Sequence, residues 1–291
     1  MKATRARLIK QMTISAYAKV NLTLEVYPTR ADGYHALRSL VLPISLSDTL
    51  NLSLAETISS DTGYPDDLIV RAVHALQAAT GCAKGVSVQV EKRIPAGGGL
   101  GGGSADAAAT LVALNRLWAL DLEINALAEI GASVGSDVPA LVWGQLGYAT
   151  IMEGRGEKVT PLKRLAPLSL VLANAAIHTS TAEVYRHAPV RAWGSTTATE
   201  QMVAALETGN LVRVGELLMN DLESAAEVAQ PEIAALRTNL ASIPGVLATR
   251  MSGSGSTVFA LAATPAEAAR IAEDFRTKKI LTWVVEGPPK I

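Results

Sequence analysis

The chain has 291 residues, a length that suits one large domain or two smaller ones. Hydrophobic residues make up 49% and the formal net charge is −1, which argues against a disordered chain and against nucleic-acid binding as the main function. The single cysteine, Cys82, excludes an intrachain disulfide and fits a reducing compartment. No apolar run approaches the roughly 18 residues of a membrane span, so we expect a cytoplasmic protein with neither a membrane nor a nucleic-acid partner.

A basic segment opens the chain and a strand pattern follows it. Residues 1–11 carry basic side chains and no acidic one. A signal peptide would place an apolar core directly after such a region. Here residues 19–26 alternate between polar and apolar side chains, which predicts a half-buried strand with Lys19 and Asn21 on one face. We therefore expect a solvated tail and then a strand.

The next segments suggest a turn, a second strand and a helix. Residues 30–35 contain Asp32-Gly33, a pair that supplies turn chemistry. Residues 40–54 resemble further strand, and the pattern of residues 67–79 predicts a helix. The first part of the chain is therefore predicted to begin with a strand pair.

A run of glycines is the most informative segment, because six of the seven residues from Gly97 to Gly103 are glycine. Glycine loses more conformational entropy on folding than any other residue, so this run indicates a backbone that must approach something closely. Residues 86–90 alternate like a strand, and residues 107–118 have helical spacing with Ser104 as the expected N-cap. Strand, glycine loop and helix N-terminus in this order are typical of phosphate binding.

Three interpretations of the glycine run compete: a loop of a known nucleotide-binding motif, a merely flexible loop, and a phosphate loop of another kind. Gly97, Gly99 and Gly102 match G-x-G-x-x-G, but Asp121, the acid a dinucleotide site would need, follows a predicted helix instead of a strand. A Walker A loop ends in Gly-Lys-Ser/Thr, and this loop has no lysine there. A merely flexible loop explains poorly why a capped helix follows directly. The third interpretation is a phosphate loop of another kind.

The rest of the chain mixes helices and strands without a regular βαβ order, which predicts an α+β fold. A loop at residues 135–139 leads into an apolar segment. We place a boundary between two domains, 1–164 and 165–291. Helices are expected at 123–134, 199–206, 211–218, 231–242 and 265–275, and strands at 168–172, 258–261 and 281–285.

Three segments, taken in order, resemble the motifs of one enzyme family. They are Ala16-Tyr17-Ala18-Lys19-Val20-Asn21-Leu22, the stretch PAGGGLGGGSADAA from Pro95 to Ala108, and MSGSGSTVF from Met251 to Phe259. Together they resemble the GHMP small-molecule kinases, and Asp32-Gly33-Tyr34-His35 is similar to a turn found in one group of them. The resemblance implies a two-domain GHMP kinase fold, with a ribosomal-protein-S5-like ATP-binding domain at 1–164 and a ferredoxin-like substrate domain at 165–291.

The resemblance also implies an activity. It is the ATP- and Mg²⁺-dependent phosphorylation of the tertiary hydroxyl of a cytidine diphosphate-linked methylerythritol, in non-mevalonate isoprenoid biosynthesis. Asp137 would be the general base, Lys19 would stabilise charge on the transferring group, and Asn21 would orient the substrate. Taken alone, an aspartate before Val-Pro is more often a helix N-cap.

Two sets of binding residues follow from the same resemblance. The acceptor would contact Tyr34, His35, Tyr185, Gly253 and Ser254. ATP would contact Pro95, Ala96, Gly97, Gly98, Gly99, Leu100, Gly101, Gly102, Gly103 and Ser104, with Asp67 near the adenine. The family often has Asn-Leu at Asp67-Leu68, and a carboxylate, unlike an amide, cannot donate to the adenine ring nitrogens. No metal ligand is assigned.

Two alternative functions remain open at this point. A GHMP kinase could act on a different acceptor, such as homoserine or a mevalonate derivative, and the Asp-Gly-Tyr-His turn argues against this. A non-catalytic sensor could bind nucleotide and sugar without transferring phosphate. Such a protein should have lost the base or the lysine, whereas both Lys19 and Asp137 are present.

Overall fold

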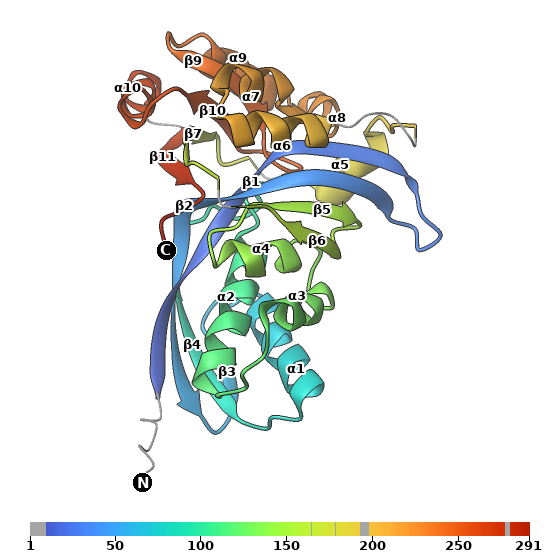
Figure 1. The fold of residues 1–291 in the computed structure, drawn as a ribbon, viewed down its shortest axis with the longest axis vertical. Helices are drawn as coiled ribbons and strands as arrows, with labels where there is room; N and C mark the ends of the chain where they lie inside the picture. Colours follow the sequence, from blue (N-terminus) through green and yellow to red (C-terminus); the bar gives the residue numbers. More distant parts are fainter. Residues whose placement is uncertain (1–9, 164, 178, 193–197, 277–279) are drawn as a thin grey trace.

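The computed structural model describes residues 10–163, 165–177, 179–192, 198–276 and 280–291, so the predicted tail at residues 1–9 lies outside it. Figure 1 shows a long sheet that runs through most of the molecule, with helices α1 to α4 beside its lower part and a second, smaller sheet near the top. Strands and helices are mixed, and the predicted α+β class is confirmed. Among the described helices, none combines the length and apolarity that crossing a bilayer requires.

The large sheet has seven strands and is built around one long antiparallel pair. The two predicted strands form this pair, and a turn at residues 30–34 joins them, within the predicted range 30–35. The expectation that residues 19–26 are half-buried is wrong, because both faces of the strand are covered and every residue from Ala18 to Tyr27 is buried. The strands are β1 (Gln11–Thr29), β2 (His35–Ala55), β3 (Ile58–Ser60), β4 (Gly85–Glu91), β5 (Thr150–Gly154), β6 (Lys158–Pro161) and β8 (Met219–Asn220). Their order is β3-β4-β2-β1-β8, with β5 pairing to β2 and β6 to β5.

Four helices lie beside the lower part of this sheet (Figure 1): α1 (Leu68–Thr80), α2 (Gly102–Leu117), α3 (Ile124–Ala132) and α4 (Val138–Gly144). The central helix, α2, packs against α1, α4 and β1, and every residue from Ala105 to Leu114 is buried. Alanines at residues 105, 107, 108, 109 and 113 let the neighbouring elements approach α2 closely. Helix α2, buried on all sides over these residues, therefore lies at the centre of the core.

The start of α2 differs from the prediction. Gly101, and not Ser104, occupies the N-cap position, with a left-handed φ of 70°. Its carbonyl accepts the first intrahelical hydrogen bond from Ala105 N at 2.8 Å. Glycine adopts this backbone conformation without steric cost, so the helix begins earlier than a serine cap would allow, and Ser104 lies within the first turn.

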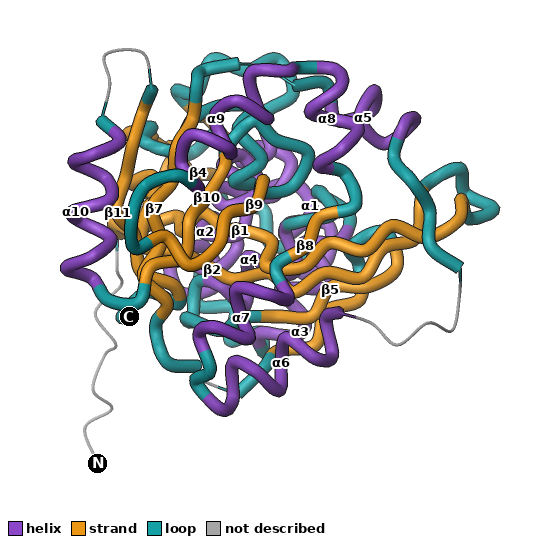
Figure 2. Tube along the Cα trace, turned by 90° about the horizontal axis from the view of Figure 1, so that it is seen from above, coloured by secondary structure: helices purple, strands orange, loops and turns teal. Residues whose placement is uncertain are grey.

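The smaller sheet is antiparallel, with the order β11-β7-β10-β9. Every residue of β7 and β10 is buried, and α9 and α10 pack against the sheet (Figure 2 shows α10 beside β11). The strands are β7 (Leu168–Asn174), β9 (Val246–Met251), β10 (Val258–Ala262) and β11 (Leu281–Gly287). The helices of this part are α5 (Thr181–His187), α6 (Ala198–Thr208), α7 (Leu211–Leu217), α8 (Glu223–Ala229), α9 (Pro231–Ala241) and α10 (Pro265–Phe275).

A two-residue strand joins the two halves of the chain. In β8, Met219 and Asn220 pair in parallel with Thr23 and Leu24 of β1. The Asn220 side chain also donates to the carbonyls of Met251, at 2.9 Å, and Gly253, at 2.7 Å. The strand that carries Lys19 is thereby connected to the C-terminal glycine motif. The boundary at 164/165 falls between β6 and β7 and stays a prediction.

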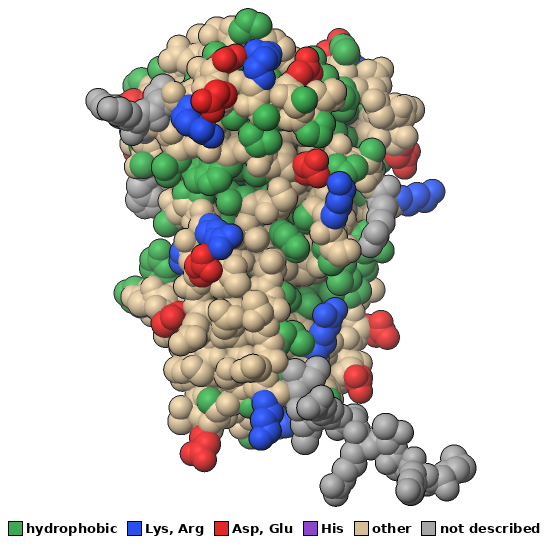
Figure 3. Space-filling model, turned by 90° about the vertical axis from the view of Figure 1, so that its left-hand side faces the viewer, with side chains coloured by type: hydrophobic (Ala, Val, Ile, Leu, Met, Phe, Trp, Pro, Cys, Tyr) green, Lys and Arg blue, Asp and Glu red, His purple; other side chains and the backbone are tan. Residues whose placement is uncertain are grey.

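On the face drawn in Figure 3, basic and acidic side chains are interspersed among apolar and uncharged ones. This distribution agrees with the nearly balanced charge of the chain, 26 basic against 27 acidic residues. A nucleic-acid-binding face would instead gather Lys and Arg into a stripe or patch.

Candidate active site

A single cleft of about 1310 Å³ collects almost all of the residues that the sequence singled out. The predicted residues that line it are Lys19, Asn21, Tyr34, His35, Asp67, Pro95, Ala96, Gly97, Gly98, Gly99, Gly101, Gly102, Gly103, Ser104, Asp137, Tyr185, Gly253 and Ser254. Leu100 differs, because its side chain is buried in the core and its carbonyl accepts from Lys19 N at 3.0 Å.

Lys19 lies at the centre of this cleft on β1. Its side chain is only 4% exposed, and its Nζ donates to Asn21 Oδ1 at 2.8 Å and to the Gly99 carbonyl at 2.9 Å. The Asp137 Oδ2 atom lies 3.6 Å from the same nitrogen. Because the strand alternates, Lys19 and Asn21 share one face as predicted, and the lysine charge is fixed between three segments that are far apart in the sequence.

Asp137 occupies the N-cap position of α4, as an aspartate before Val-Pro should, but its side chain makes no capping hydrogen bond. The carboxylate is 32% exposed and forms an ion pair with Lys19. A capping aspartate would accept from the backbone N–H groups of its own helix. This carboxylate is therefore available to a molecule in the cleft.

The glycine loop is packed tightly against the C-terminal glycine motif. The Gly99 carbonyl accepts from Ser252 Oγ at 2.9 Å, and the Gly98 carbonyl accepts from Thr257 N at 3.2 Å. A Cβ atom at Gly99, whose φ is +73°, would lie 2.1 Å from the Ser252 carbonyl oxygen. Part of the glycine run is thus required by contact between two segments of the protein itself.

Directly after this loop, the N-terminus of α2 faces the cleft. The first intrahelical bond is donated by Ala105 N, so the N–H groups of Gly102, Gly103 and Ser104 precede the helix ladder. All three residues line the cleft. Unpaired N–H groups at the positive end of a helix form an anion-binding site.

A buried ion cluster supports this helix end, and sequence reasoning missed two of its three members. Lys92 Nζ lies 2.5 Å from Asp48 Oδ2 and 2.7 Å from Asp106 Oδ2. Asp48 is fully buried and also accepts from the backbone N–H groups of Arg93 and Ile94. Burial raises the pKa of Asp106 to about 7, although Lys92 opposes the change.

The cluster supplies the basic side chain that the loop itself lacks. Burial lowers the pKa of Lys92, but the two carboxylates outweigh it and the net change is upward, which keeps the lysine charged. Lys92 lines the cleft close to Gly102. Its position five residues before the glycine run was visible in the sequence, but its partner Asp48 is 44 residues away.

Aromatic side chains gather at another part of the cleft. The His35 and Tyr185 rings are stacked, with centroids 6.0 Å apart and an interplanar angle of 28°. His35 Nδ1 is within hydrogen-bonding distance, 3.0 Å, of the Tyr27 carbonyl, which fixes the ring. Burial, together with the nearby Asp137 charge, raises the pKa of Tyr185, so this phenol stays neutral. Both residues were expected at the acceptor from the family resemblance, and the structure brings their rings together, while their contact with an acceptor stays a prediction.

Gly253 and Ser254 lie between the aromatic rings and Lys19. Ser254 Oγ is 2.8 Å from Thr181 Oγ1 on α5, so the glycine motif and α5 are in direct contact. A Cβ at Gly253, whose φ is +57°, would lie 3.2 Å from Lys19 Nζ. The motif therefore passes directly beside the central lysine.

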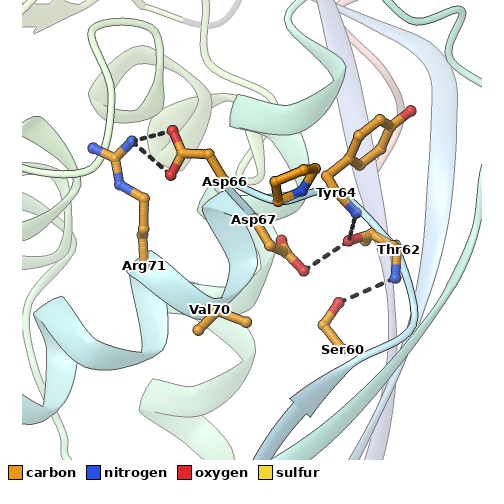
Figure 4. Close-up of a pocket in the computed structure, with 9 residues that line it drawn as sticks. Ser60, Thr62, Tyr64, Asp66, Asp67, Val70 and Arg71 are labelled. Atoms are coloured by element: carbon orange, nitrogen blue, oxygen red, sulfur yellow. Dashed lines mark hydrogen bonds and ion pairs between the residues drawn. The ribbon is translucent and has the colours of Figure 1, made fainter.

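Asp67 has a structural role that uses both carboxylate oxygens. It caps α1 by accepting from Ile69 N at 2.8 Å, and it accepts from Thr62 Oγ1 at 2.7 Å. Figure 4 shows this contact in a smaller pocket of about 410 Å³, where Arg71 pairs with Asp66. Asn and Asp are about equally good N-caps, so aspartate preserves the helix start, while a contact between Asp67 and a nucleotide stays a prediction.

Comparison with known proteins identifies the family. Residues 67–145 match the pattern described as GHMP kinases N terminal domain, and residues 202–280 match GHMP kinases C terminal. Proteins named 4-diphosphocytidyl-2-C-methyl-D-erythritol kinase from Symbiobacterium thermophilum and Gloeobacter violaceus are 39% and 41% identical to this chain. The alignments cover 94% and 89% of this chain, and 99% and 88% of those proteins.

Solved structures agree with this assignment. A crystal structure of 4-(cytidine 5'-diphospho)-2C-methyl-D-erythritol kinase has a TM-score of 0.80 at 35% identity, covering 95% of this chain and 99% of that one. A homoserine kinase from Cytophaga hutchinsonii shares the fold, with a TM-score of 0.78 at 18% identity, covering 98% of this chain and 97% of that one. The predicted two-domain fold is confirmed. The chain belongs to the GHMP kinase family, alongside its relatives named 4-diphosphocytidyl-2-C-methyl-D-erythritol kinase.

Proposed function

We propose that the protein transfers the γ-phosphoryl group of ATP to the tertiary 2-hydroxyl of 4-diphosphocytidyl-2-C-methyl-D-erythritol, within non-mevalonate isoprenoid biosynthesis. The relatives at about 40% identity carry that substrate in their names. The observation that supports the chemistry most directly is the Lys19–Asp137 pair, 3.6 Å apart, in a cleft that also holds a helix N-terminus and an aromatic stack.

The donor end of the cleft is formed by the glycine loop, the first turn of α2 and Lys92. There the N–H groups of Gly102, Gly103 and Ser104 would bind the phosphates of ATP, with Lys92 adding a positive charge. In-line transfer needs the γ-phosphoryl group to be held and its charge neutralised. Backbone N–H donors at a helix N-terminus would both hold the phosphates and offset their charge, without the lysine of a Walker A loop.

The residues present also suit Mg²⁺. No group of three or more His, Cys, Asp or Glu side chains among the described residues could hold a metal by itself. Mg²⁺ usually binds through substrate phosphates, water and one or two carboxylates, so such a cage is not needed. The Asp106 Oδ1 atom is buried without a hydrogen-bond partner and, with the Ser104 hydroxyl, could face the ion. When bound, Mg²⁺ would neutralise charge on the phosphates.

The acceptor end of the cleft is formed by Tyr34, His35, Tyr185 and Arg155. Aromatic rings stack on a nucleobase with little regard to its hydrogen-bonding pattern, and His35 can add a hydrogen bond to a base edge. A cytosine placed here would extend its diphosphate and polyol toward Asp137. Gly253 and Ser254 line the path between them.

At the centre of the cleft, the tertiary hydroxyl oxygen of the acceptor would attack the γ-phosphorus, and Asp137 would accept the proton of that hydroxyl. The bond from the γ-phosphorus to the β–γ bridging oxygen breaks, and ADP leaves with that electron pair. Lys19 would stabilise the negative charge on the transferring group, because its Nζ is held by Asn21 and the Gly99 carbonyl. The 3.6 Å distance between Lys19 Nζ and Asp137 Oδ2 supports both roles.

A direct assay tests the proposal. Purified protein with Mg-ATP and the cytidine-linked substrate should release ADP, and ³¹P NMR should show a new phosphomonoester on the methylerythritol carbon. Homoserine and mevalonate serve as competing acceptors. A folded protein without turnover, or one that phosphorylates homoserine in preference, would overturn the assignment. Binding of both ligands without transfer would indicate the non-catalytic sensor.

A further inference from the structure

Arg155 lines the acceptor end from the turn between β5 and β6. Its guanidinium carbon lies 5.6 Å from the centre of the Tyr34 ring, a cation–π contact with a side chain that is 58% exposed. The cleft cations Lys19, Lys92 and Arg71 each have an acidic partner. Within the described residues, Arg155 and Arg186 line the cleft without one. Such cations are available to an anionic ligand.

The Arg155 turn lies next to the reacting carboxylate. The neighbouring Gly156 has a φ of +120°, and a Cβ there would lie 2.5 Å from the Ser136 carbonyl oxygen. Ser136 directly precedes Asp137. On its other side the turn reaches Tyr34, which precedes His35 of the aromatic stack. The turn that carries Arg155 therefore adjoins both the segment of Asp137 and the segment of His35.

Ion pairs hold the Arg155 turn against the Tyr34 turn. Glu157 accepts from Arg155 N at 2.6 Å and from Arg30 Nη1 at 3.0 Å, and Arg30 Nε lies 3.2 Å from Asp32. Partial burial of Glu157 is outweighed by the hydrogen bonds it accepts from backbone N–H groups and Arg30, which lower its pKa and keep it ionised. The guanidinium of Arg155 therefore projects from a fixed backbone.

We propose that Arg155 is a specificity-determining residue that binds the diphosphate of the acceptor. The inference rests on the proposed function. In an alcohol linked to a nucleoside diphosphate, the diphosphate lies between the base and the hydroxyl, and the Arg155 turn adjoins both the segment of His35 and the segment of Asp137. A guanidinium presents a planar fork of donors that matches phosphate oxygens in pairs, and a lysine does not.

Calorimetry with simple nucleotides tests this assignment. The affinities of CDP, CMP and cytidine are measured with the donor site filled by a non-hydrolysable ATP analogue. Arg155→Gln should weaken CDP binding about 10-fold or more and leave cytidine unchanged, because only the charged contact is lost. Arg155→Lys should restore part of the loss. Lys158→Gln removes an exposed charge three residues away, outside the cleft lining, and should change nothing.

The outcomes separate this inference from the proposed function. If Arg155→Gln binds CDP as tightly as the unaltered protein, the assignment of Arg155 is wrong even when turnover is present. It is also overturned if the unaltered protein binds CDP no better than cytidine, or if cytidine affinity falls as much as CDP affinity. A selective loss of CDP affinity supports it even if the methylerythritol compound is not phosphorylated, in which case the proposed substrate alone fails.

Discussion

At the donor end of the cleft, backbone carbonyls and N–H groups form the site, and the Gly98 and Gly99 carbonyls are fixed against residues 252–257. At the acceptor end, the side chains of Tyr34, His35 and Arg155 project from turns and strand ends. Backbone at such close contact tolerates almost no side chain, whereas exposed side chains can be exchanged. The donor end should therefore tolerate substitution less than the acceptor end.

The largest expected effect lies where the two ends meet. Asp137→Asn should lower kcat about 10²- to 10⁴-fold, because the hydroxyl proton loses its acceptor, while ATP-analogue and CDP affinities stay unchanged. Steady-state kinetics and calorimetry check both parts. Asp274→Asn, an exposed residue of α10 paired with Arg270, is the matched control and should keep full activity. A near-normal kcat for Asp137→Asn would remove this residue from the role of base.

Two glycine substitutions compare how tightly the donor and acceptor ends of the cleft are packed, through their effect on the free energy of unfolding. Gly99→Ala should lower the free energy of unfolding by about 2–5 kcal/mol, because alanine there meets both a left-handed φ and the Ser252 carbonyl. Gly33→Ala, in the Tyr34 turn, has a φ of +84° but no atom within 4 Å of the added Cβ. It should lose only about 1–2 kcal/mol. Urea unfolding measures both, and equal losses would refute the contrast in packing.

A pH profile isolates the buried cluster at the donor end. Because the folded pKa of Asp106 is raised to about 7, its contribution to stability is complete below the unfolded pKa of about 4 and is lost as the pH rises through about 7. Asp106→Asn removes the titration. Unfolding measured between about pH 4 and pH 8 should show the stability of the unaltered protein falling relative to the variant, by at most about 1.4 kcal/mol per pH unit.

The control for this profile is Asp66→Asn, an exposed carboxylate paired with Arg71, which should run parallel to the unaltered protein. If Asp106→Asn also ran parallel, Asp106 would be an ordinary carboxylate. The donor end would then owe no part of its pH dependence to the buried cluster.

The smallest effect is expected for Arg30→Gln at the acceptor end. Its ion pairs with Asp32 and Glu157 are partly exposed, so the stability should change by no more than about 1 kcal/mol. The KM of the acceptor should rise by about five-fold at most, because the two turns are held less firmly. The KM of ATP should not move. A rise in the KM of ATP instead would show that the donor and acceptor ends do not act independently.

Local patterns predicted the features that depend on neighbours in the sequence. Alternation in β1 placed Lys19 and Asn21 on one face, and the glycine run before an alanine-rich segment predicted a loop that leads into a helix. The resemblance to a family added the partners that lie far away, Asp137 and Tyr185. Contacts with such distant residues could not be derived from spacing in the sequence. Lys19 and Asp137, for example, are 118 positions apart.

Features that depend on packing between distant segments were missed. The cap of α2 was wrong because a left-handed glycine carries no signal that distinguishes it from the glycines around it. The two-residue strand β8 is too short for any periodicity. No sequence pattern singled out Lys92 or Arg155, because the contacts that distinguish them, with Asp48 and Tyr34, join distant segments.

The short strand β8 also bears on what happens when the chain is produced as two separate fragments. A fragment that ends near residue 164 would retain β1 with Lys19 but lose β8, which belongs to the second fragment together with Asn220 and Ser252. Each half would expose hydrogen-bonding groups that only the other half can satisfy. The chain is therefore a natural candidate for split-enzyme reporters, in which reassembly of two inactive fragments restores catalysis.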